Sequence, residues 1–498
     1  MSPVAGSPTD LDDRRRSPLV SPPGDFAATR RTKVVCTIGP ATAERIVALA
    51  GAGMDVARIN FSHGTPESHV ATARAVQRAS AGAGRPLAIL TDLAGPKIRL
   101  GALVGGAVEL EAGRPFILRV ATKGPATGDA SGARVSYRRM AADVKVGDPI
   151  FLADGAAQLR VSGTDDENGV RTDVVRGGTV RSGAGVAVPA ARLSSPALTT
   201  RDRADIPRAI SIGATYVGLS FVRGAQDIAE LRRLLGTDGP RIVAKIETRP
   251  AVESFDAILD VTDVVMIARG DLGVELPYEQ VPLIQKQLVG RALERGVPTI
   301  VATQMLESMI AAPRPTRAEA SDVANAVFDG TDAIMLSGET AIGAHPLEAA
   351  ETAARIASLC EVEGAAYLPS GMSRPPGTDT GALAYAAVTL AATHAEIAAI
   401  ACYTRTGRTA RILASLRPRV PVIAFTPDPE VGSRLALING VVPRLSVALD
   451  ESDRLGRLNE LLGEARLLGD GATVVLVSST ATPGSAPNLL GIQRVVVS

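Results

Sequence analysis

The stretch from residue 264 to residue 304 reads VVMIARGDLGVELPYEQVPLIQKQLVGRALERGVPTIVATQ, and its pattern decides the fold. Its ends, 264–268 and 299–304, are short runs of β-branched and apolar residues, which are typical of buried strands. Between them, residues 278–295 carry apolar side chains at helical spacing, which predicts a helix. Strand, helix and strand in this order predict a βα repeat whose strands pair in parallel.

The same alternation extends along the chain on both sides of this stretch. Alanine-rich segments of helical period, such as 66–80, separate most of the apolar runs. Eight βα units predict a closed (β/α)8 TIM barrel in an α/β protein. The other six predicted strands lie at 33–38, 54–59, 87–92, 216–221, 241–247 and 333–337.

Two breaks in this alternation divide the chain. Runs such as RPFILRV and DPIFLADG, separated by Gly, Asp and Pro without helical period, predict a small β-barrel domain inserted into the TIM barrel. A second α/β alternation, with strands predicted near 397–403, 420–425 and 473–478, follows the Pro- and Gly-rich linker at 370–379. We therefore expect a disordered tail at 1–29, the barrel at 30–101 and 196–370, the inserted β domain at 102–195, and a C-terminal α/β domain at 377–498.

The composition excludes several classes of function. The 498 residues include 53 basic and 52 acidic side chains, and a net charge of +1 gives no attraction to nucleic acid or to an anionic membrane. Three widely spaced cysteines, no apolar run of 18 residues and no signal peptide predict a cytoplasmic protein that does not span a membrane. Only six basic residues are lysines, so each lysine is a candidate for a role that needs a compact ammonium.

Polar residues gather where the predicted barrel strands end. Catalytic groups of TIM barrels lie at this C-terminal rim, because the loops that follow the strands form it. For a single residue the alternative is a loop cap, but here most of the strands contribute. The candidates are Arg58, Asn60, Ser62, Asp92, Lys245, Glu247, Arg269, Gly270, Asp271, Thr303, Gln304, Ser337 and Glu339.

Two of these residues suit a divalent metal ion. Glu247 and Asp271 follow successive strands, so their carboxylates can converge, and hard oxygen ligands favour Mg²⁺ or Mn²⁺. Lys245 alternates with Glu247 on one strand, which places an ammonium on the same side. With Arg58 these charges would surround an anion, as phosphoryl transfer requires. The alternative is an ion-pair network that only stabilises the rim.

Several runs go beyond what a barrel requires and resemble the pyruvate kinase family. They are VVCTIGPA (34–41), ARINFSHGT (57–65), DLAGPKIR (92–99), ARGDLGVELP (268–277) and PRPTRAEASDVANAVFDGTDAIMLSGETA (313–341), and the resemblance covers about residues 31–498. It implies formation of ATP and pyruvate from ADP and phosphoenolpyruvate, with Mg²⁺ or Mn²⁺ as cofactor. It also implies a homotetramer.

The resemblance implies roles for the matching rim residues. Lys245 would stabilise the transferring phosphoryl group, and Arg58 would bind the phosphate. Thr303 would lie against the enolate, and Ser337 would belong to a proton relay. The metal would bind Glu247 and Asp271, the substrate would also meet the backbone N–H groups of Gly270 and Asp271, and the nucleotide would contact Asn60, His63 and Arg99.

Lys97 bears on the monovalent cation. In many family members a glutamate stands at this position and K⁺ is bound by residues matching Asn60, Ser62 and Asp92. An ammonium is close to K⁺ in size and charge, so Lys97 would supply the cation covalently and K⁺ would not be required. The inserted domain departs from the family at Ala184 and Ala187, where a lysine and an asparagine are usual, and Arg181 is the candidate replacement cation.

The predicted C-terminal domain contains a candidate effector loop. Thr404, Arg405, Thr406, Gly407, Arg408 and Thr409 follow an apolar strand and open a helix, where backbone N–H groups can bind phosphate. The alternative is a purely structural turn, but the two arginines favour a phosphorylated allosteric effector. Pro487 replaces a threonine common in the family, so the effector's identity does not transfer.

Two other functions remain open from the sequence alone. A metal-dependent barrel lyase acting on pyruvate or oxaloacetate would use the same carboxylate pair. A catalytically weak regulatory paralogue would keep the fold and sense metabolites through its C-terminal domain. Lys245 and the inserted domain argue against the lyase, and the complete set of rim residues argues against the paralogue.

Overall fold

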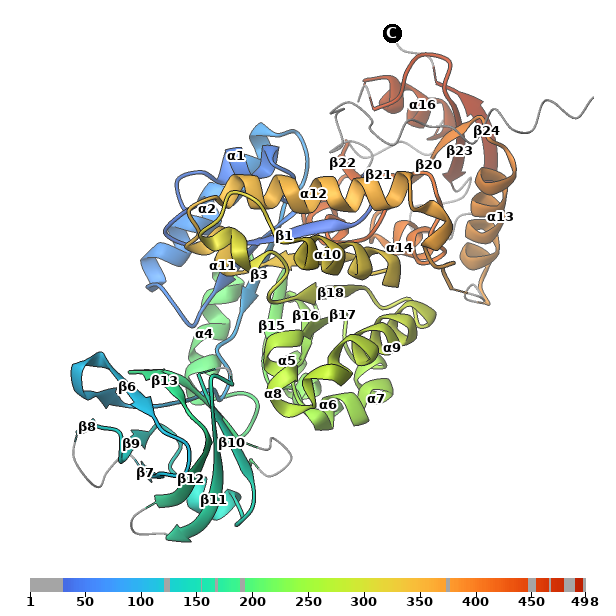
Figure 1. Ribbon diagram of the computed structural model, residues 1–498. Coiled ribbons are helices and arrows are strands. Elements are labelled where there is room, and N and C mark those ends of the chain that lie inside the picture. The colour runs from blue at the N-terminus through green and yellow to red at the C-terminus, as the bar shows by residue number, and fades with distance from the viewer. Residues whose placement is uncertain are drawn as a thin grey trace, which may run out of the picture.

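A computed structural model describes the chain at residues 30–120, 126–153, 155–165, 169–188, 193–372, 377–446, 454–464, 467–478 and 489–495. The predicted tail at 1–29, part of the predicted linker and Pro487 lie outside these residues. The chain forms a central barrel with a β domain beyond one end and an α/β domain beyond the other (Figure 1). No helix in the described part of the chain is long and apolar enough to cross a bilayer.

The central barrel is closed and wholly parallel, as the sequence predicted. Its eight strands pair in the order β1-β19-β18-β17-β16-β15-β3-β2. Seven of these strands fall within a predicted apolar run and β2 extends one residue beyond its run, because both faces of a parallel barrel strand are covered. The strands are β1 (Lys33–Thr37), β2 (Val56–Asn60), β3 (Ala88–Asp92), β15 (Tyr216–Leu219), β16 (Arg241–Ile246), β17 (Val264–Ala268), β18 (Thr299–Ala302) and β19 (Ala333–Leu336).

Helices surround this barrel and start at residues that satisfy their first N–H groups. The side chains of Thr65, Thr199 and Thr316 each accept a hydrogen bond from the backbone three residues on, within a capping box. The helices are α1 (Ile46–Gly51), α2 (Pro66–Gly82), α4 (Thr200–Ser211), α5 (Ala225–Leu235), α6 (Arg249–Glu253), α7 (Phe255–Leu259), α8 (Arg269–Glu275), α9 (Val281–Glu294), α10 (Arg317–Asp329), α11 (Gly338–Ala341) and α12 (Pro346–Val362).

The inserted domain is built from short strands that pair mostly antiparallel, although β7 pairs with β9 and β5 pairs with β8 in parallel. Seven of them pair in the order β4-β14-β10-β11-β12-β7-β9, and a bridge between Leu100 and Val135 joins the two edges of this sheet. The sequence predicted only three of these strands and no helix, because most are too short to show a period. The elements are β4 (Ile98–Arg99), β5 (Ala102–Leu103), β6 (Ala107–Leu110), β7 (Pro115–Val120), β8 (Thr127–Gly128), β9 (Gly132–Val135), α3 (Met140–Asp143), β10 (Pro149–Leu152), β11 (Ala157–Asp165), β12 (Gly169–Arg176), β13 (Gly178–Arg181) and β14 (Gly185–Ala187).

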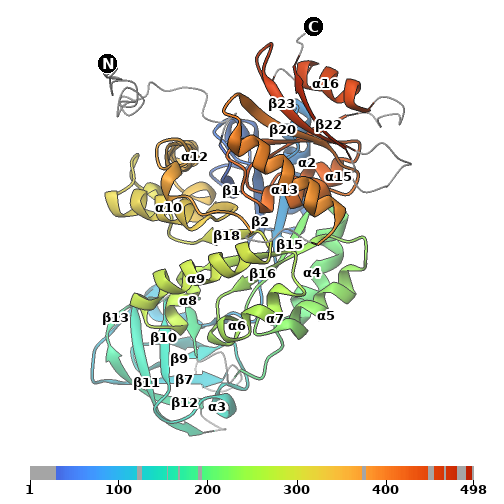
Figure 2. The same ribbon diagram turned by 90° about the vertical axis from the view of Figure 1, so that its right-hand side faces the viewer.

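The C-terminal domain is a five-stranded sheet in the order β22-β21-β20-β23-β24, with β24 antiparallel to its neighbour. The sequence predicted β20, β21 and β23 but not the two edge strands. In Figure 2 helices α13 and α16 lie against this sheet. The elements are α13 (Asp379–Thr393), β20 (Ile397–Tyr403), α14 (Arg408–Ser415), β21 (Val422–Thr426), α15 (Pro429–Leu435), β22 (Val441–Leu445), α16 (Arg454–Glu464), β23 (Thr473–Ser478) and β24 (Leu489–Arg494).

Candidate active site

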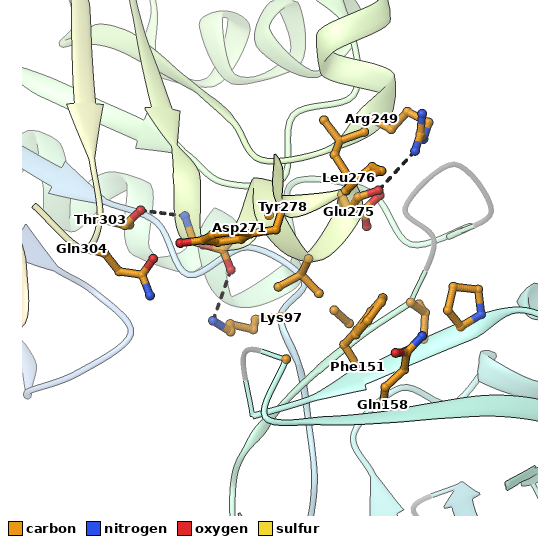
Figure 3. A pocket seen from close by; sticks show the side chains of 18 of the residues that line it. Lys97, Phe151, Gln158, Arg249, Asp271, Glu275, Leu276, Tyr278, Thr303 and Gln304 are labelled. Atoms are coloured by element: carbon orange, nitrogen blue, oxygen red, sulfur yellow. Dashed lines mark hydrogen bonds and ion pairs between the residues drawn. The ribbon is translucent and has the colours of Figure 1, made fainter. Parts of the chain in front are cut away.

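A cavity of about 1050 Å³ lies between the C-terminal rim of the barrel and the inserted domain. Asp271, Thr303 and Ser337 line it from the barrel, and Phe151 and Gln158 line it from the inserted domain. Figure 3 shows the two groups facing each other across the opening. The inserted domain therefore forms one wall of a site whose opposite wall is the predicted rim.

Lys245 is the centre of a buried charge cluster at this rim. Its ammonium Nζ lies 2.9 Å from Glu247 Oε1 and 3.3 Å from Asp92 Oδ2, and it donates a hydrogen bond of 2.8 Å to Ser220 Oγ. Burial alone would lower the pKa of Lys245, but the Asp92 and Glu247 carboxylates raise it above its ordinary value. Lys245 is therefore a fixed positive charge at neutral pH.

Arg58 lies on the other side of the same carboxylate. Its Nε donates to Asp92 Oδ2 at 2.9 Å, and its Nη1 donates to Thr37 Oγ1 at 3.1 Å. Burial would raise the pKa of Asp92, but Lys245 and Arg58 together hold it below its usual value. Asp92 thus orients both cations, while its Oδ1 is buried without a hydrogen-bond partner.

Glu247 and Asp271 line one small cavity together, as their positions after successive strands predicted. Glu247 Oε2 accepts a hydrogen bond of 2.8 Å from the backbone N–H of Phe221. Burial raises the pKa of Glu247, Lys245 opposes the rise, and the nearby charge of Asp271 adds to it.

These two carboxylates fit a divalent cation. The charge of Asp271 disfavours the ionised form of Glu247, and a cation that binds between the two carboxylates relieves this repulsion. The described residues contain no group of three or more His, Cys, Asp or Glu side chains placed to hold a metal. A pair of carboxylates such as Glu247 and Asp271 suits an ion such as Mg²⁺, which keeps several coordination positions for water and substrate oxygens.

Lys97 reaches the metal side of the site. Its Nζ lies 3.5 Å from Asp271 Oδ1, and Figure 3 shows the two side chains pointing toward each other. The prediction that Lys97 serves a pocket of Asn60, Ser62 and Asp92 did not anticipate this contact. Asn60 Oδ1 accepts from the Ser62 N–H at 3.0 Å, and Asp92 is occupied by Arg58 and Lys245.

Thr303 and Gln304 have a strained backbone. Their φ angles are +71° and +55°, in the left-handed region that residues other than glycine rarely adopt. Arg269 holds this segment, because its Nη2 donates to the Thr303 carbonyl at 2.8 Å and its Nη1 lies 2.6 Å from Asp322 Oδ2. Thr303 Oγ1 in turn accepts a hydrogen bond of 2.7 Å from the Gly270 N–H.

Ser337 also lines the main cavity, and Glu339 positions it. The fully buried Glu339 accepts hydrogen bonds from the Ser337 N–H at 2.7 Å and from the Leu306 N–H at 3.0 Å. This carboxylate joins the loops after β18 and β19. It therefore has a structural role, which the sequence left undefined.

His63 lies at the edge of the rim among cations. Burial lowers its pKa, and the charges of Arg99 and Arg58 lower it further. Arg99 is exposed on β4 and donates from Nη1 to the Gly183 carbonyl at 3.2 Å. The buried His69 stacks on Phe61 and bonds to the His63 carbonyl, so its role is structural.

The cation that the inserted domain contributes to the cavity is Arg176. It lines the cavity together with Ala187 and donates to the Gly155 carbonyl at 2.6 Å. The sequence suggested Arg181 as the replacement cation, but Arg181 lies on β13, which pairs with β6 outside the seven-stranded sheet. That suggestion is corrected to Arg176.

The Thr404–Thr409 loop joins β20 to α14 in the C-terminal domain. Thr404 is buried and its Oγ1 accepts the Gly407 N–H at 3.0 Å, so this hydroxyl closes the turn. Gly407 has a φ of +80°, which favours glycine. Thr409 is buried, whereas Arg405, Thr406 and Arg408 are exposed. The exposed arginines remain the candidates for binding an anion.

Sequence reasoning did not identify Ser220, Phe221 and Arg269 as supports of the site. Ser220 and Phe221 follow β15, whose exit residues were not considered although they occupy the same rim. Arg269 was noted only as a rim residue. Its contact with Thr303 depends on the strained turn after β18, which no sequence pattern indicates.

Comparisons with known proteins agree with this geometry. Residues 29–350 match the pyruvate kinase barrel domain, and residues 381–492 match the pyruvate kinase alpha/beta domain. A pyruvate kinase of Mycobacterium tuberculosis is 41% identical over 474 residues, which cover 94% of this chain and 99% of that protein. A pyruvate kinase of Geobacillus stearothermophilus is 42% identical over 434 residues, which cover 86% of this chain and 73% of that protein.

A solved structure gives the same result. The crystal structure of a pyruvate kinase from Cryptosporidium parvum matches with a TM-score of 0.83 and 32% identity, covering 95% of this chain and 98% of that one. The barrel with its inserted domain and the C-terminal domain are thus shared with proteins of one family. This chain belongs to the pyruvate kinase family.

Proposed function

We propose that this protein is a phosphotransferase that moves the phosphoryl group of phosphoenolpyruvate to ADP, giving pyruvate and ATP. The observation that carries the proposal is the buried Lys245, held charged beside Asp92 and Glu247 at the C-terminal rim of the barrel. A preorganised cation stabilises the charge that spreads over the phosphoryl oxygens during transfer.

Lys245 has three partners, and a substrate phosphate could replace one of them. Its three N–H groups face Ser220, Glu247 and Asp92, and the contact to Asp92 is the longest. Substrate phosphate would replace that contact, and Arg58 would bind the same phosphate from the other side. Asp92 would keep Arg58 oriented, while Glu247 and Ser220 would keep Lys245 oriented.

The proposed metal is Mg²⁺ or Mn²⁺, held by Glu247 and Asp271. When bound, the ion would neutralise negative charge on the substrate. Lys97 would add a fixed positive charge beside Asp271 and replace K⁺ with support from Asn60, Ser62 and Asp92. Thr303 would contact the enolate, with Gly270 and Asp271 nearby, and Ser337 would take part in delivering the proton.

The remaining assignments complete the proposal. The nucleotide would meet Asn60, His63 and Arg99, where cations already surround His63. The protein would act in the cytoplasm as a homotetramer, and a phosphorylated effector would bind the Thr404–Thr409 loop. The family match favours this reaction over the barrel lyase, and the intact charge cluster argues against a catalytically weak paralogue.

Replacing Lys245 tests the central step. We expect Lys245→Met to lower kcat by about a thousandfold, because the loss of one transition-state charge donor costs about 3–4 kcal/mol. Pyruvate formation is measured in a coupled assay, and Mn²⁺ binding is measured by water-proton relaxation. The matched control is Lys286→Met on α9, which removes a lysine paired with Asp329 away from the rim.

The outcomes separate the hypotheses. The proposal expects Mn²⁺ to bind the Lys245→Met protein and the control to retain activity. Near-normal turnover of Lys245→Met would reject the role of Lys245. Pyruvate release from oxaloacetate by the unmodified protein without ADP, with no ATP made from phosphoenolpyruvate, would identify the lyase instead.

A further inference from the structure

A second large cavity, of about 520 Å³, lies between the barrel and the C-terminal domain. The barrel side contributes Arg31, Gly330 and Glu361, and the C-terminal domain contributes Val388 of α13 and the Leu416–Arg419 segment after α14. Figure 1 shows the C-terminal end of α12, which carries Glu361, reaching toward α13. None of its lining residues belongs to the rim cavity or to the Thr404–Thr409 loop.

Three guanidinium groups line this cavity. Arg417 is paired with Asp332 at 2.8 Å, and Arg31 Nε lies 3.8 Å from Glu361 Oε2. Arg419 is exposed and forms no ion pair with any residue in the described part of the chain. Among the described residues, Asp332 and Glu361 pair with Arg417 and Arg31, and Arg419 is left without a carboxylate partner.

The two pairings leave the guanidinium groups incompletely satisfied. Burial lowers the pKa of Arg31, Glu361 raises it, and the charges of Arg419 and Arg417 lower it again, so the three cations repel one another. The Arg417 Nε is buried without a hydrogen-bond partner. Arg417 also has a φ of +50°, so its position is held against backbone strain. An anion is the missing partner for this cluster.

Much of the remaining wall is apolar, although Thr32, Ser370 and Asn439 also line it. Val327, Leu368, Val388, Ala391 and Leu416 line the cavity away from the arginines. Its volume falls within the roughly 300–1,000 Å³ of small-molecule sites, which are mostly apolar with a few polar groups. A ligand that fits must therefore carry an anionic group on a small apolar body.

We propose that this cavity binds a small organic phosphate, whose phosphate group pairs with Arg419 and Arg31 while its body packs against Val388, Ala391 and Leu416. Planar guanidinium groups match phosphate oxygens in pairs, which favours a phosphate over a neutral ligand. Because the cavity walls come from two domains, the bound phosphate connects the barrel to the C-terminal domain. The site is separate from the active site and from the proposed effector loop.

The test uses phenyl phosphate as the probe and calorimetric titration of the full chain. We expect Arg419→Gln to weaken one class of phenyl phosphate site by about tenfold or more, because a hydrogen-bonded charge is lost. The matched control, Arg405→Gln in the effector loop, leaves that class unchanged. Arg419 is exposed, so the thermal midpoint of Arg419→Gln should stay near that of the unmodified protein.

A second variant tests the apolar part of the site. Ala391→Leu should weaken phenyl phosphate binding several-fold while leaving the affinity for inorganic phosphate at the same site unchanged. A crystal of the unmodified protein soaked with phenyl phosphate should show the phosphate beside Arg419. Identical isotherms for Arg419→Gln and the unmodified protein, or phosphate bound only at the rim or effector loop, would overturn the proposal.

Discussion

Two lysines at the rim, Lys245 and Lys97, have different surroundings and different proposed roles. Lys245 is buried among Asp92 and Glu247, whereas Lys97 is a third exposed and pairs with Asp271 at 3.5 Å. In the proposed function, the first position needs a charge that faces the reacting phosphate. The second needs a charge beside the carboxylate that would hold the metal. An arginine at either position would bring a bulkier, planar cation, so the two lysines stand out in an arginine-rich chain.

The position of Lys97 predicts that activity does not depend on K⁺. A tethered ammonium needs no cation from bulk salt, so rates in K⁺, Na⁺ and tetramethylammonium salts at equal ionic strength should agree within about twofold. Lys97→Glu should create a K⁺ requirement, because it removes the ammonium and adds a carboxylate beside Asp271. The measurement is initial pyruvate formation across the three salts.

The control for this charge reversal is Lys145→Glu, at an exposed lysine of the inserted domain. That variant should remain insensitive to the choice of cation. A many-fold rise in the rate of the unmodified protein on adding K⁺ would contradict the substitution hypothesis.

At the scale of elements, the sequence predicted the repeated strands of the barrel but missed an edge strand and a contact that a loop conformation determines. All eight barrel strands were predicted, because each is a continuous apolar run buried on both faces. β22 was missed because Pro443 interrupts its apolar run, and proline is tolerated there only because β22 is an edge strand. The pairing of Lys97 with Asp271 was missed because loop conformation sets it.

The candidate site shows the same division. Lys245, Glu247 and Asp271 were placed correctly near one another, since neighbouring strands end at one rim. The hydrogen bond from Arg269 to the Thr303 carbonyl depends on the positive φ angles of Thr303 and Gln304. No sequence pattern indicates such backbone strain.

The loop before α14 predicts a specific regulatory defect. Arg405 and Arg408 are exposed and lie far from the rim charges, so Arg405→Ala combined with Arg408→Ala should abolish activation by a phosphorylated effector without changing kcat. The measurement is the phosphoenolpyruvate saturation curve with and without added sugar phosphates or nucleoside monophosphates. Removing Arg74 and Arg78 from the exposed face of α2 is the matched control.

The regulatory assignment is rejected by either of two results. One is a saturation curve of the unmodified protein that none of these phosphates shifts. The other is full activation of the Arg405→Ala, Arg408→Ala protein.

The whole molecule depends on contacts between the base of the barrel and the C-terminal domain. Leu437 and Ala436 follow α15 and join the cluster of side chains that fills the barrel interior, so the C-terminal domain closes the barrel from below. Tyr216 donates its hydroxyl hydrogen to the Arg434 carbonyl at 2.6 Å. Lys33 on β1 donates from Nζ to the Val441 carbonyl of β22 at 2.7 Å. These polar contacts accompany the apolar packing of Ala436 and Leu437 against the barrel interior.

Lys33 predicts how this junction responds to pH. Burial lowers its pKa to about 8, although the charge of Asp55 opposes the shift, while the unfolded chain keeps the ordinary value of 10.5. Between these two pH values the unfolded chain binds more protons than the folded chain, so stability rises with pH. A neutral amine still donates to the Val441 carbonyl, and therefore the contact persists as the charge is lost.

The thermal midpoint of the unmodified protein minus that of Lys33→Met should thus increase from pH 7.5 to pH 9.5. Groups that titrate in both proteins cancel in this difference, so a difference that stays constant or falls would show that Lys33 is not a buried charge at the junction.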